Sequence, residues 1–500
     1  MSIPLVQRAR GHGERTAIAA LEGTFSYSDL LSDSERGARR LLGGRPDLEE
    51  TRVAFLAPST YAYAVTQWAV WRAGGIAVPL CTVHPRPELE YVVEDSEAEI
   101  LIAHPDFEER LRPIAQARGL RWLSTAALPE AGPHDEPGAA LPSVEPGRRA
   151  MIVYTSGTAS RPKGVVTTHA NIAAQIESLV TAWQWRPDDR ILLVLPLHHV
   201  HGIINVLCCA LWTGAVCEML PGFEAEEVWR RFLGGTLTLF MAVPTIYARL
   251  IAAWEAAPED RRRQMSAACG AFRLMVSGSA ALPVGVLEKW REISGHVLLE
   301  RYGMTEIGMA LSNPLEGERR PGHVGRPLPG VEVRRLDEQG RPPGLEEPGE
   351  IEVRGPGVFR EYWRRPEATA KAFRDGWFRT GDVAVVEDGC YRILGRKSVD
   401  IIKTGGYKVS ALEIEEVLRQ HPAIVECAVV GVPDPEWGER VVAAVVLEGA
   451  EELALEGLRE WAKERLAAYK VPTRLVTVPE LPRNALGKVT KPELVERFQG

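Results

Sequence analysis

The chain has 500 residues, of which 45% are hydrophobic and 25% charged, and its formal net charge is −8. At about 150 residues per domain, this length corresponds to roughly three domains, which can bury a large core without disulfides or a structural metal. The hydrophobic fraction excludes a disordered chain. The mildly acidic balance argues against nucleic acid or an anionic membrane as a bulk electrostatic partner.

Seven cysteines are scattered along the sequence, and no two have CxxC spacing. Such a pattern is typical of buried apolar thiols in a reducing compartment. The first residues lack the apolar run of a secretory signal peptide, so we expect a cytoplasmic protein. The segment 200–217 contains no Asp, Glu, Lys or Arg. It is shorter than the ~20 residues of a membrane span and therefore predicts a buried core helix.

Apolar strand-like runs alternate with amphipathic segments through the first half of the sequence. Residues 52–56 predict a buried strand, and residues 61–72 predict the helix that follows it. Further strands are predicted at 75–79, 100–103, 150–154, 190–195, 237–243 and 273–276. A surface loop is predicted at 126–146, where Pro, Gly, Glu and Ala are frequent. The alternation indicates α/β layers around mostly parallel sheets.

The pattern changes near residue 322. Short strands predicted at 331–336, 349–354 and 389–394 are separated by Gly and Pro turns, which indicates a β-rich subdomain. The last hundred residues predict helices at 412–420 and 453–466 and strands at 424–432 and 440–447. The predicted fold is α/β, with a large N-terminal domain of two βαβ-layered subdomains and a β-rich subdomain, followed by a small α+β C-terminal domain.

A loop suited to phosphate follows the strand predicted at 150–154. It reads YTSGTASRPKGV, in which small and hydroxyl residues let the backbone approach a phosphate and Lys163 adds a positive charge. Its glycines do not fit the GxxxxGK[ST] spacing of a P-loop. By itself this segment is equally consistent with a polar surface turn.

Three further segments carry candidate chemistry. In ERYGMTE, Tyr302 could stack on a purine, Thr305 could contact a phosphate and Glu306 could bind Mg²⁺. In WFRTGD, Asp382 could accept ribose hydroxyls, although Asp is also common in β-turns. In PRNALGKVTK, Lys488 follows a glycine, and a solvated lysine is the ordinary alternative.

The joint occurrence of these segments is far more specific than any one of them. YTSGTxxxPKG, SGSA, YGMTE, TGD, GRKSVDIIK and PRNxxGK each occur once, in this order. Together they resemble the adenylate-forming superfamily of acyl-CoA synthetases, firefly luciferase and peptide-synthetase adenylation domains, over essentially the whole chain. Within it, HHVHG, PTIYARL, SGSAALP and ERYGMTE are most similar to malonyl-CoA synthetases.

The resemblance implies an ATP-dependent ligation in two steps. The acid attacks the α-phosphate of ATP to give an acyl-adenylate and pyrophosphate, and the thiol of coenzyme A then displaces AMP. The implied ligands are ATP, Mg²⁺, coenzyme A and malonate, with methylmalonate as a second candidate. Nucleic acid and membrane are not expected as partners, and the expected assembly is a monomer or a homodimer.

The resemblance also assigns roles to individual residues. Lys488, Thr305 and Glu306 are implied as catalytic, and Glu306 with Thr158 as the metal ligands. The implied ATP and AMP site consists of Thr155, Ser156, Gly157, Thr158, Lys163, Ser279, Ala280, Tyr302, Gly303, Met304, Thr305, Asp382 and Arg396. In this phosphate loop, Ala159 and Ser160 replace the second Thr and the Gly that the family usually has.

Malonate is expected because two arginines stand where malonyl-CoA synthetases bind the distal carboxylate. These are Arg249 and Arg301, and the same pocket is expected to include His199, His201, Ser277 and Gly278. A buried guanidinium recognises a carboxylate through two hydrogen bonds and stays charged. The alternative is that Arg249 lies on a helix surface and Arg301 has a structural role.

The resemblance further implies a domain boundary. The N-terminal adenylation domain is expected to span 1–396 and the mobile C-terminal domain 397–500, with a hinge near Lys397. Gly405, Gly406 and Tyr407 are expected to face coenzyme A. The alternatives are a CoA ligase for another short-chain or aromatic acid, an adenylating enzyme that loads a carrier protein, and a non-catalytic nucleotide-binding protein.

Overall fold

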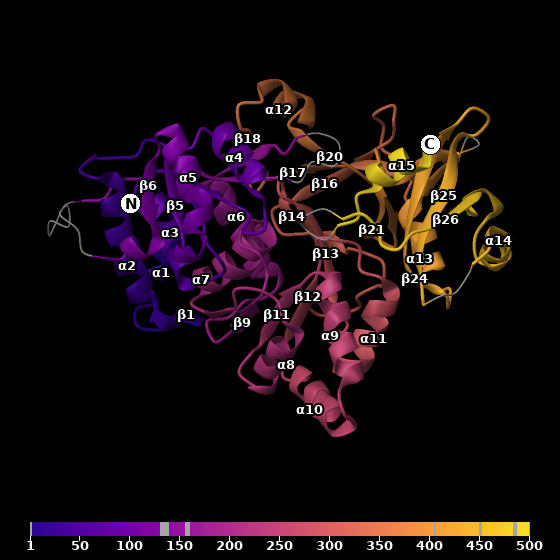
Figure 1. The fold of residues 1–500 in the computed structure, drawn as a ribbon, viewed down its shortest axis with the longest axis horizontal. Helices are drawn as coiled ribbons and strands as arrows, with labels where there is room; N and C mark the ends of the chain where they lie inside the picture. Colours follow the sequence, from indigo (N-terminus) through magenta and orange to yellow (C-terminus); the bar gives the residue numbers. More distant parts are fainter. Residues whose placement is uncertain are drawn as a thin grey trace.

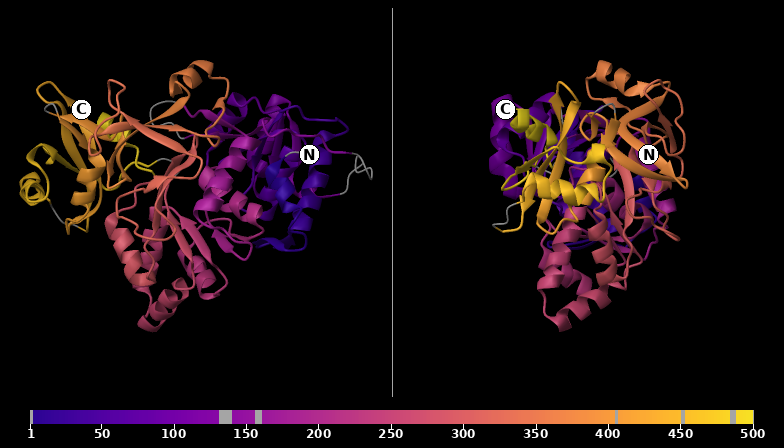
Figure 2. Two further views of the ribbon diagram at one scale, coloured as in Figure 1. Left: turned by 180° about the vertical axis from the view of Figure 1, so that it is seen from behind. Right: turned by 90° about the vertical axis from the view of Figure 1, so that its right-hand side faces the viewer.

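The computed structural model describes residues 3–130, 140–155, 161–404, 407–449, 453–483 and 488–499. Two layered sheets occupy most of the long axis, and a β-rich subdomain connects them to a small C-terminal unit at the far end (Figure 1). The two further views in Figure 2 agree that this unit lies beside the β-rich subdomain. The layers have the predicted α/β character. Residues 131–139 of the predicted surface loop lie outside the described residues.

The first large sheet has the strand order β18-β8-β7-β4-β3-β5-β6, and β7, β4, β3, β5 and β6 are parallel. Val53 and Phe55 face a core shared with the second sheet, whereas Ala54 and Leu56 face a separate outer core. Burial on both faces is typical of a parallel sheet. The strands are β3 (Arg52–Leu56), β4 (Ile76–Pro79), β5 (Ile100–Ala103), β6 (Arg121–Ser124), β7 (Arg149–Tyr154), β8 (Gly164–Thr168) and β18 (Glu361–Tyr362).

Helices cover both faces of this sheet. The inner face packs against α2 (Tyr27–Leu42) and α3 (Tyr61–Arg72). The outer face packs against α4 (Arg86–Asp95) and α5 (Glu108–Arg118). Single 3₁₀ turns at Pro105–Phe107 and Thr125–Ala127 complete the connections.

The second large sheet has the order β15-β14-β13-β12-β11-β9-β10-β1-β2. Its centre, from β1 to β13, is parallel, and β2, β14 and β15 are antiparallel edges. The strands are β1 (Thr16–Ala20), β2 (Gly23–Ser26), β9 (Arg190–Leu193), β10 (Val216–Met219), β11 (Leu239–Ala242), β12 (Leu274–Ser277), β13 (Leu299–Met304), β14 (Gly308–Ser312) and β15 (Arg326–Pro327).

Four helices form the lobe below this sheet in Figure 1. They are α8 (Ala225–Leu233), α9 (Pro244–Ala256), α10 (Glu259–Cys269) and α11 (Val284–Ser294). Trp290 of α11 stacks against Trp229 of α8 and meets Tyr247 of α9 edge-on. These buried rings fix the helices that flank the carboxyl ends of β11 and β12.

The apolar segment 200–217 was predicted to be one buried helix, and that prediction is wrong in detail. The segment is buried, but it forms a π-helix (His201–Cys208), a short α7 (Cys209–Thr213) and the start of β10. Gly214 ends α7 in the left-handed conformation at φ 82°, which a glycine adopts without strain. Helices α1 (Pro4–Ala9) and α6 (His169–Ala182) belong to the same core.

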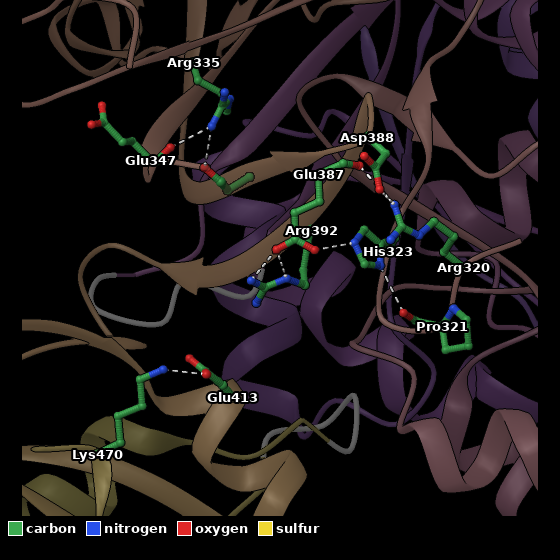
Figure 3. Close-up of polar contacts among 11 residues, drawn as sticks. Arg320, Pro321, His323, Arg335, Glu347, Glu387, Asp388, Arg392, Glu413 and Lys470 are labelled. Carbon is green, nitrogen blue, oxygen red and sulfur yellow. Dashed lines mark hydrogen bonds and ion pairs between the residues drawn. The ribbon is translucent and has the colours of Figure 1, made fainter. Parts of the chain in front are cut away.

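The β-rich subdomain is an antiparallel sheet. Its elements are β16 (Glu332–Leu336), β17 (Gly349–Arg354), α12 (Pro366–Ala372), β19 (Phe373–Arg374), β20 (Trp377–Glu387) and β21 (Cys390–Arg396). Figure 3 shows how its β20–β21 hairpin is held against the segment before β15. His323 Nε2 lies 2.9 Å from Glu387 Oε2, and Arg320 pairs with Asp388 at 3.0 Å.

The C-terminal unit is an α+β sandwich, as predicted. Its elements are β22 (Ile401–Thr404), β23 (Tyr407–Ser410), α13 (Ala411–Leu418), β24 (Ile424–Asp434), β25 (Gly438–Leu447), α14 (Leu455–Lys463), a 3₁₀ turn (Ala468–Lys470), β26 (Arg474–Thr477) and α15 (Lys491–Gln499). Within the unit, Lys470 pairs with Glu413 at 2.5 Å (Figure 3). The turn at 397–400 joins β21 of one sheet to β22 of the other. Among the described residues, none of the helices is long and apolar enough to cross a membrane.

Candidate active site

The candidate site lies where the parallel strands β11, β12 and β13 end. Ser277 ends β12 and is followed by Gly278, Ser279 and Ala280, while the last four residues of β13 are Arg301, Tyr302, Gly303 and Met304. Thr305 and Glu306 occupy the turn between β13 and β14. Ligands of open α/β sheets bind at the carboxyl ends of the strands, so the topology brings these residue groups to the expected place.

Arg301 is buried, and no carboxylate of the described residues forms a salt bridge with it. Its side chain is 3% exposed, and its Nε and one terminal nitrogen make no hydrogen bond. Burial lowers its pKa to about 9. A Cβ at Gly278 would lie 2.5 Å from the guanidinium carbon, so a larger residue there would displace the Arg301 side chain from its present position.

Glu300, the neighbour of Arg301, does not compensate its charge at neutral pH. Burial raises the pKa of Glu300 to about 8, so the protonated form dominates at pH 7. Its Oε1 accepts a hydrogen bond from the backbone of Leu282 at 3.1 Å, and its Oε2 makes none. The protein therefore keeps a buried guanidinium beside a neutral acid. Such a cation is costly without an anion.

Several polar atoms of the predicted acyl pocket have no hydrogen-bond partner among the described residues. His201 is buried and lies close enough for the charge of Arg301 to add to the effect of burial, and its pKa falls well below the usual value. Its Nδ1 is 3.1 Å from Ser279 Oγ, while its Nε2, the Nε2 of His199 and Ser277 Oγ make no hydrogen bond. Buried polar groups are normally paired, so this set is suited to a polar ligand.

Arg249 has a different environment. It lies on α9 with an exposed side chain, and its guanidinium is 5.4 Å from the centre of the Phe223 ring. Arg301, by contrast, is enclosed. The structure thus places the two arginines that were predicted to share one carboxylate in unlike surroundings.

A connected set of side chains supports the predicted ribose site. Tyr302 donates its hydroxyl to Asp382 Oδ2 at 2.5 Å, and Arg396 Nε lies 3.1 Å from Asp382 Oδ1. Burial raises the pKa of Asp382, and the charge of Arg396 opposes this change. Because Asp382 is on β20 and Arg396 ends β21, their pairing places this carboxylate next to the 397–400 turn.

Glu306 fits the predicted metal site. It is 5% exposed, its Oε1 accepts from the Tyr362 hydroxyl at 2.9 Å, and its Oε2 makes no hydrogen bond. The Lys163 ammonium lies over the Tyr362 ring at 4.6 Å, so Lys163 and Glu306 meet at one tyrosine. A buried carboxylate oxygen without a partner is a suitable ligand for Mg²⁺. Thr158, the other predicted ligand, lies outside the described residues.

Lys488 reaches this site from the C-terminal unit. The charges of Arg396 and Arg301 add to the desolvation of Lys488 and lower its pKa, while Asp382 opposes the shift. Lys488 also contributes to the low pKa of His199. The ammonium therefore lies within electrostatic range of both the ribose side and the Arg301 side. Lys488 is exposed to solvent.

Of the remaining predicted residues, the structure describes Thr155, Lys397 and Tyr407. Thr155 N donates to Lys163 O at 3.0 Å and so closes the phosphate loop, but Ser156, Gly157, Thr158, Ala159 and Ser160 are outside the described residues. Lys397 pairs with Glu350 at 3.4 Å. Tyr407 is 54% exposed and stacks on Tyr469 at 4.2 Å. Gly405 and Gly406 are not described.

Two residues of the site were not predicted from the sequence. The motif ERYGMTE assigns no role to Glu300, although an acid next to an arginine on a buried strand indicates shifted pKa values for both. Tyr362, which contacts both Lys163 and Glu306, comes from a two-residue strand almost two hundred residues after Lys163. No local pattern marks it.

The fold and the site can now be set against known proteins. The AMP-binding enzyme family matches residues 5–363, and the AMP-binding enzyme C-terminal domain matches residues 413–488. The chain belongs to the AMP-binding enzyme family. The predicted superfamily, fold class and enzyme class, an AMP-forming acid–CoA ligase, are thereby confirmed.

Relatives of this family include malonate–CoA ligases. The chain is 49% identical to the mitochondrial malonate–CoA ligase ACSF3 of Bos taurus, covering 99% of this chain and 90% of the relative. It is 40% identical to the malonate–CoA ligase of Arabidopsis thaliana, covering 97% and 86%. Among solved structures, ATP-bound MatB from Rhodopseudomonas palustris superposes with a TM-score of 0.91 at 34% identity, covering 100% and 99%.

The expected cytoplasmic location is wrong. The ligases from Bos taurus, Mus musculus and Homo sapiens are named as mitochondrial, and these relatives point to a mitochondrial location instead. Composition could not reveal this, because an organelle address is a short segment that is separate from the folded domains. Free buried cysteines exclude neither compartment.

Proposed function

We propose that this protein joins malonate to coenzyme A through a malonyl-adenylate, releasing AMP and pyrophosphate. The observation that carries the proposal is the buried guanidinium of Arg301, which forms no salt bridge with any carboxylate of the described residues. The names of the relatives, malonate–CoA ligases from animals and a plant, support the same substrate.

The choice of a dicarboxylate follows from the energetics of this charge. One carboxylate of malonate must react, and the other must be held away from the reaction. A guanidinium enclosed by protein gives the second carboxylate two directed hydrogen bonds, and the anion in turn relieves an isolated buried cation. A monocarboxylic acid would leave the guanidinium and its polar neighbours unpaired, so the same pocket rejects it.

In the adenylation step, the residues of this chain orient two anions that repel each other. Arg301 holds the distal carboxylate, and Asp382 with Arg396 holds the ribose hydroxyls. The pKa of Lys488 is lowered by the charges of both Arg301 and Arg396, so its ammonium is close enough to both sides of the site to neutralise the reacting carboxylate and the α-phosphate. Thr305, in the turn before Glu306, contacts the α-phosphate.

The phosphate and metal sites complete this arrangement. Thr155, Ser156, Gly157, Thr158 and Lys163 hold the β- and γ-phosphates, and Glu306 with Thr158 would bind Mg²⁺. When bound, the cation would neutralise phosphate charge. Ser279, Ala280, Gly303 and Met304 frame the adenine together with Tyr302.

We further propose that the hinge lies at Lys397, between an adenylation domain of residues 1–396 and a C-terminal domain of residues 397–500. The 397–400 turn joins the two sheets, and a rotation there would remove Lys488 from the site. Gly405, Gly406 and Tyr407 would then face coenzyme A. Such domain alternation separates the two half-reactions.

The deciding experiment measures pyrophosphate release from purified protein with ATP, Mg²⁺ and a panel of acids, with and without coenzyme A. The panel contains malonate, methylmalonate, acetate, propionate, octanoate and coumarate. We expect malonate to give the highest kcat/KM, with AMP and malonyl-CoA as products. Better turnover of acetate, octanoate or coumarate would overturn the substrate, and adenylate formation that ignores free coenzyme A would favour carrier-protein loading.

A further inference from the structure

A buried lysine outside the reaction site connects the hinge turn to the loop that carries Lys488. Lys491 lies three residues after Lys488, at the first position of α15, and is 7% exposed. Its ammonium is 2.6 Å from Asp400 Oδ1 and 2.7 Å from Glu415 Oε1. A single buried cation thus bridges the hinge turn and α13.

Asp400 extends this bridge across the turn. Its Oδ2 accepts from the backbone N of Arg396 at 2.9 Å, while its Oδ1 faces Lys491. Arg396 in turn pairs with Asp382 of β20. One carboxylate therefore links a residue of the proposed ribose site to the C-terminal domain. A Cβ at Gly395 would lie 2.3 Å from Asp400 Cβ, so the turn is closely packed as well as charged.

The other side of Lys491 is anchored in the core of the C-terminal domain. Glu415 is 3% exposed, and its Oε1 also accepts from the backbone N of Val429 on β24 at 2.8 Å. Thr490 N donates to Pro482 O at 2.8 Å, and Arg483 forms a β-bridge with Val489. These bonds hold Val489 and Thr490, which lie between Lys488 and Lys491, against Pro482 and Arg483.

We propose that Lys491 is a positioning residue for adenylation: it holds the Lys488 loop in register with the 397–400 turn through Asp400. This inference rests on the proposed function, because it assigns Lys491 to the half-reaction that uses Lys488. The ammonium has carboxylates on both sides, and these keep it charged against the cost of burial. The contacts of Lys491 are with Asp400 and Glu415, so it acts through the position of Lys488.

A positioning role can be distinguished from a purely structural one, because the ion pairs of Lys491 with Asp400 and with Glu415 can be removed independently. Asp400→Asn keeps an oxygen that can accept from Arg396 N but loses the ion pair with Lys491. Glu415→Gln keeps an acceptor for Val429 N, weakens the contact of Lys491 with α13 and removes the ion pair of Glu415 with Arg419, while the contact of Lys491 with the 397–400 turn stays. If Lys491 merely stabilises its domain, the two variants should affect both half-reactions alike.

The test measures each half-reaction in the full-length protein. Adenylation is followed by malonate-dependent ATP–pyrophosphate exchange, and thioester formation by adding coenzyme A to preformed malonyl-adenylate. We expect Lys491→Met and Asp400→Asn to slow adenylation by about tenfold or more, since small misplacements of a catalytic group are costly. Thioester formation should keep the wild-type rate, and Lys491→Arg should restore much of the adenylation rate.

Two comparisons keep the result interpretable. Arg440→Met removes an exposed ion pair with Asp434 in the same domain and should leave both half-reactions unchanged. Glu415→Gln should lower the melting temperature without a selective loss of adenylation. Equal loss of both half-reactions in Asp400→Asn, or no loss in either, would overturn the positioning role. Failure of the wild-type protein to use malonate would instead refute the proposed function.

Discussion

Replacement of Arg301 by methionine tests the charge argument quantitatively. Burial lowers the pKa of Arg301 from 12.5 to about 9. At about 1.4 kcal/mol for each tenfold change in proton affinity, the charged side chain costs the ligand-free protein on the order of 5 kcal/mol. Met fills a similar volume without a charge. We therefore expect Arg301→Met to raise the stability of the ligand-free protein at pH 7, with this figure as an upper bound.

The pH dependence gives the sign of this effect. The pKa of Arg301 is lower in the folded chain than in the unfolded chain, so the cost is fully present below pH 9 and disappears as pH rises toward 12.5. The stability advantage of Arg301→Met should thus shrink above pH 9. Malonate should raise the melting temperature of the wild-type protein and leave that of the variant unchanged.

The assay for function compares malonate with propionate, which has a methyl group in place of the second carboxylate. The wild-type protein should prefer malonate in kcat/KM by a factor of about 10⁴, and Arg301→Met should lose most of this preference while keeping its KM for ATP. Arg319→Met is the matched control, because Arg319 donates to three backbone carbonyls. That control should lose stability and keep the preference. A variant at Arg301 that still selects malonate would refute the reasoning.

Three further predictions follow from the same site. Burial raises the pKa of Glu300 to about 8, so its contribution to the stability of the fold is full below pH 4.5 and is lost as pH rises to about 8. Glu300→Gln should therefore remove this pH dependence of the melting temperature and keep malonate turnover at pH 7. A large loss of activity at pH 7 would show that the ionised form is needed. Lys488 has a lowered pKa, so the adenylation rate should fall at alkaline pH with a midpoint below 10.5. Lys488→Arg should move this alkaline limb of the pH–rate profile to higher pH. An unshifted limb would assign it to another group. Tyr302→Phe removes the hydrogen bond to Asp382 and should raise the KM for ATP about fivefold without changing the KM for malonate. A larger change in the KM for malonate would place Tyr302 in the acyl pocket.

Local sequence patterns predicted the layers well, because strands of a parallel sheet are short apolar runs bounded by turn-forming residues. The strands at Ile100–Ala103 and Gly349–Arg354 have the predicted bounds. The failure at 200–217 has a clear cause: an apolar run has no periodicity to distinguish an α-helix from a π-helix, and only Gly214 marks where helix gives way to β10.

For the site, too, local sequence patterns predicted some residues and missed others. Motifs found the residues that lie together in sequence, such as Tyr302 and Glu306, because one hairpin carries them. They could not find Tyr362, which reaches Glu306 through a strand pairing between β18 and β8. Nor could they distinguish Arg301, which is enclosed, from Arg249, which is exposed on α9, because burial is decided by the packing of distant elements.

The most direct test of the central claim is a crystal structure of the protein with malonyl-adenylate or a stable analogue of it. We expect the distal carboxylate to lie within hydrogen-bond distance of the Arg301 guanidinium, with Lys488 at the junction of the acyl group and the phosphate. A distal carboxylate that points to solvent or to Arg249, with Arg301 contacting no anion, would contradict it.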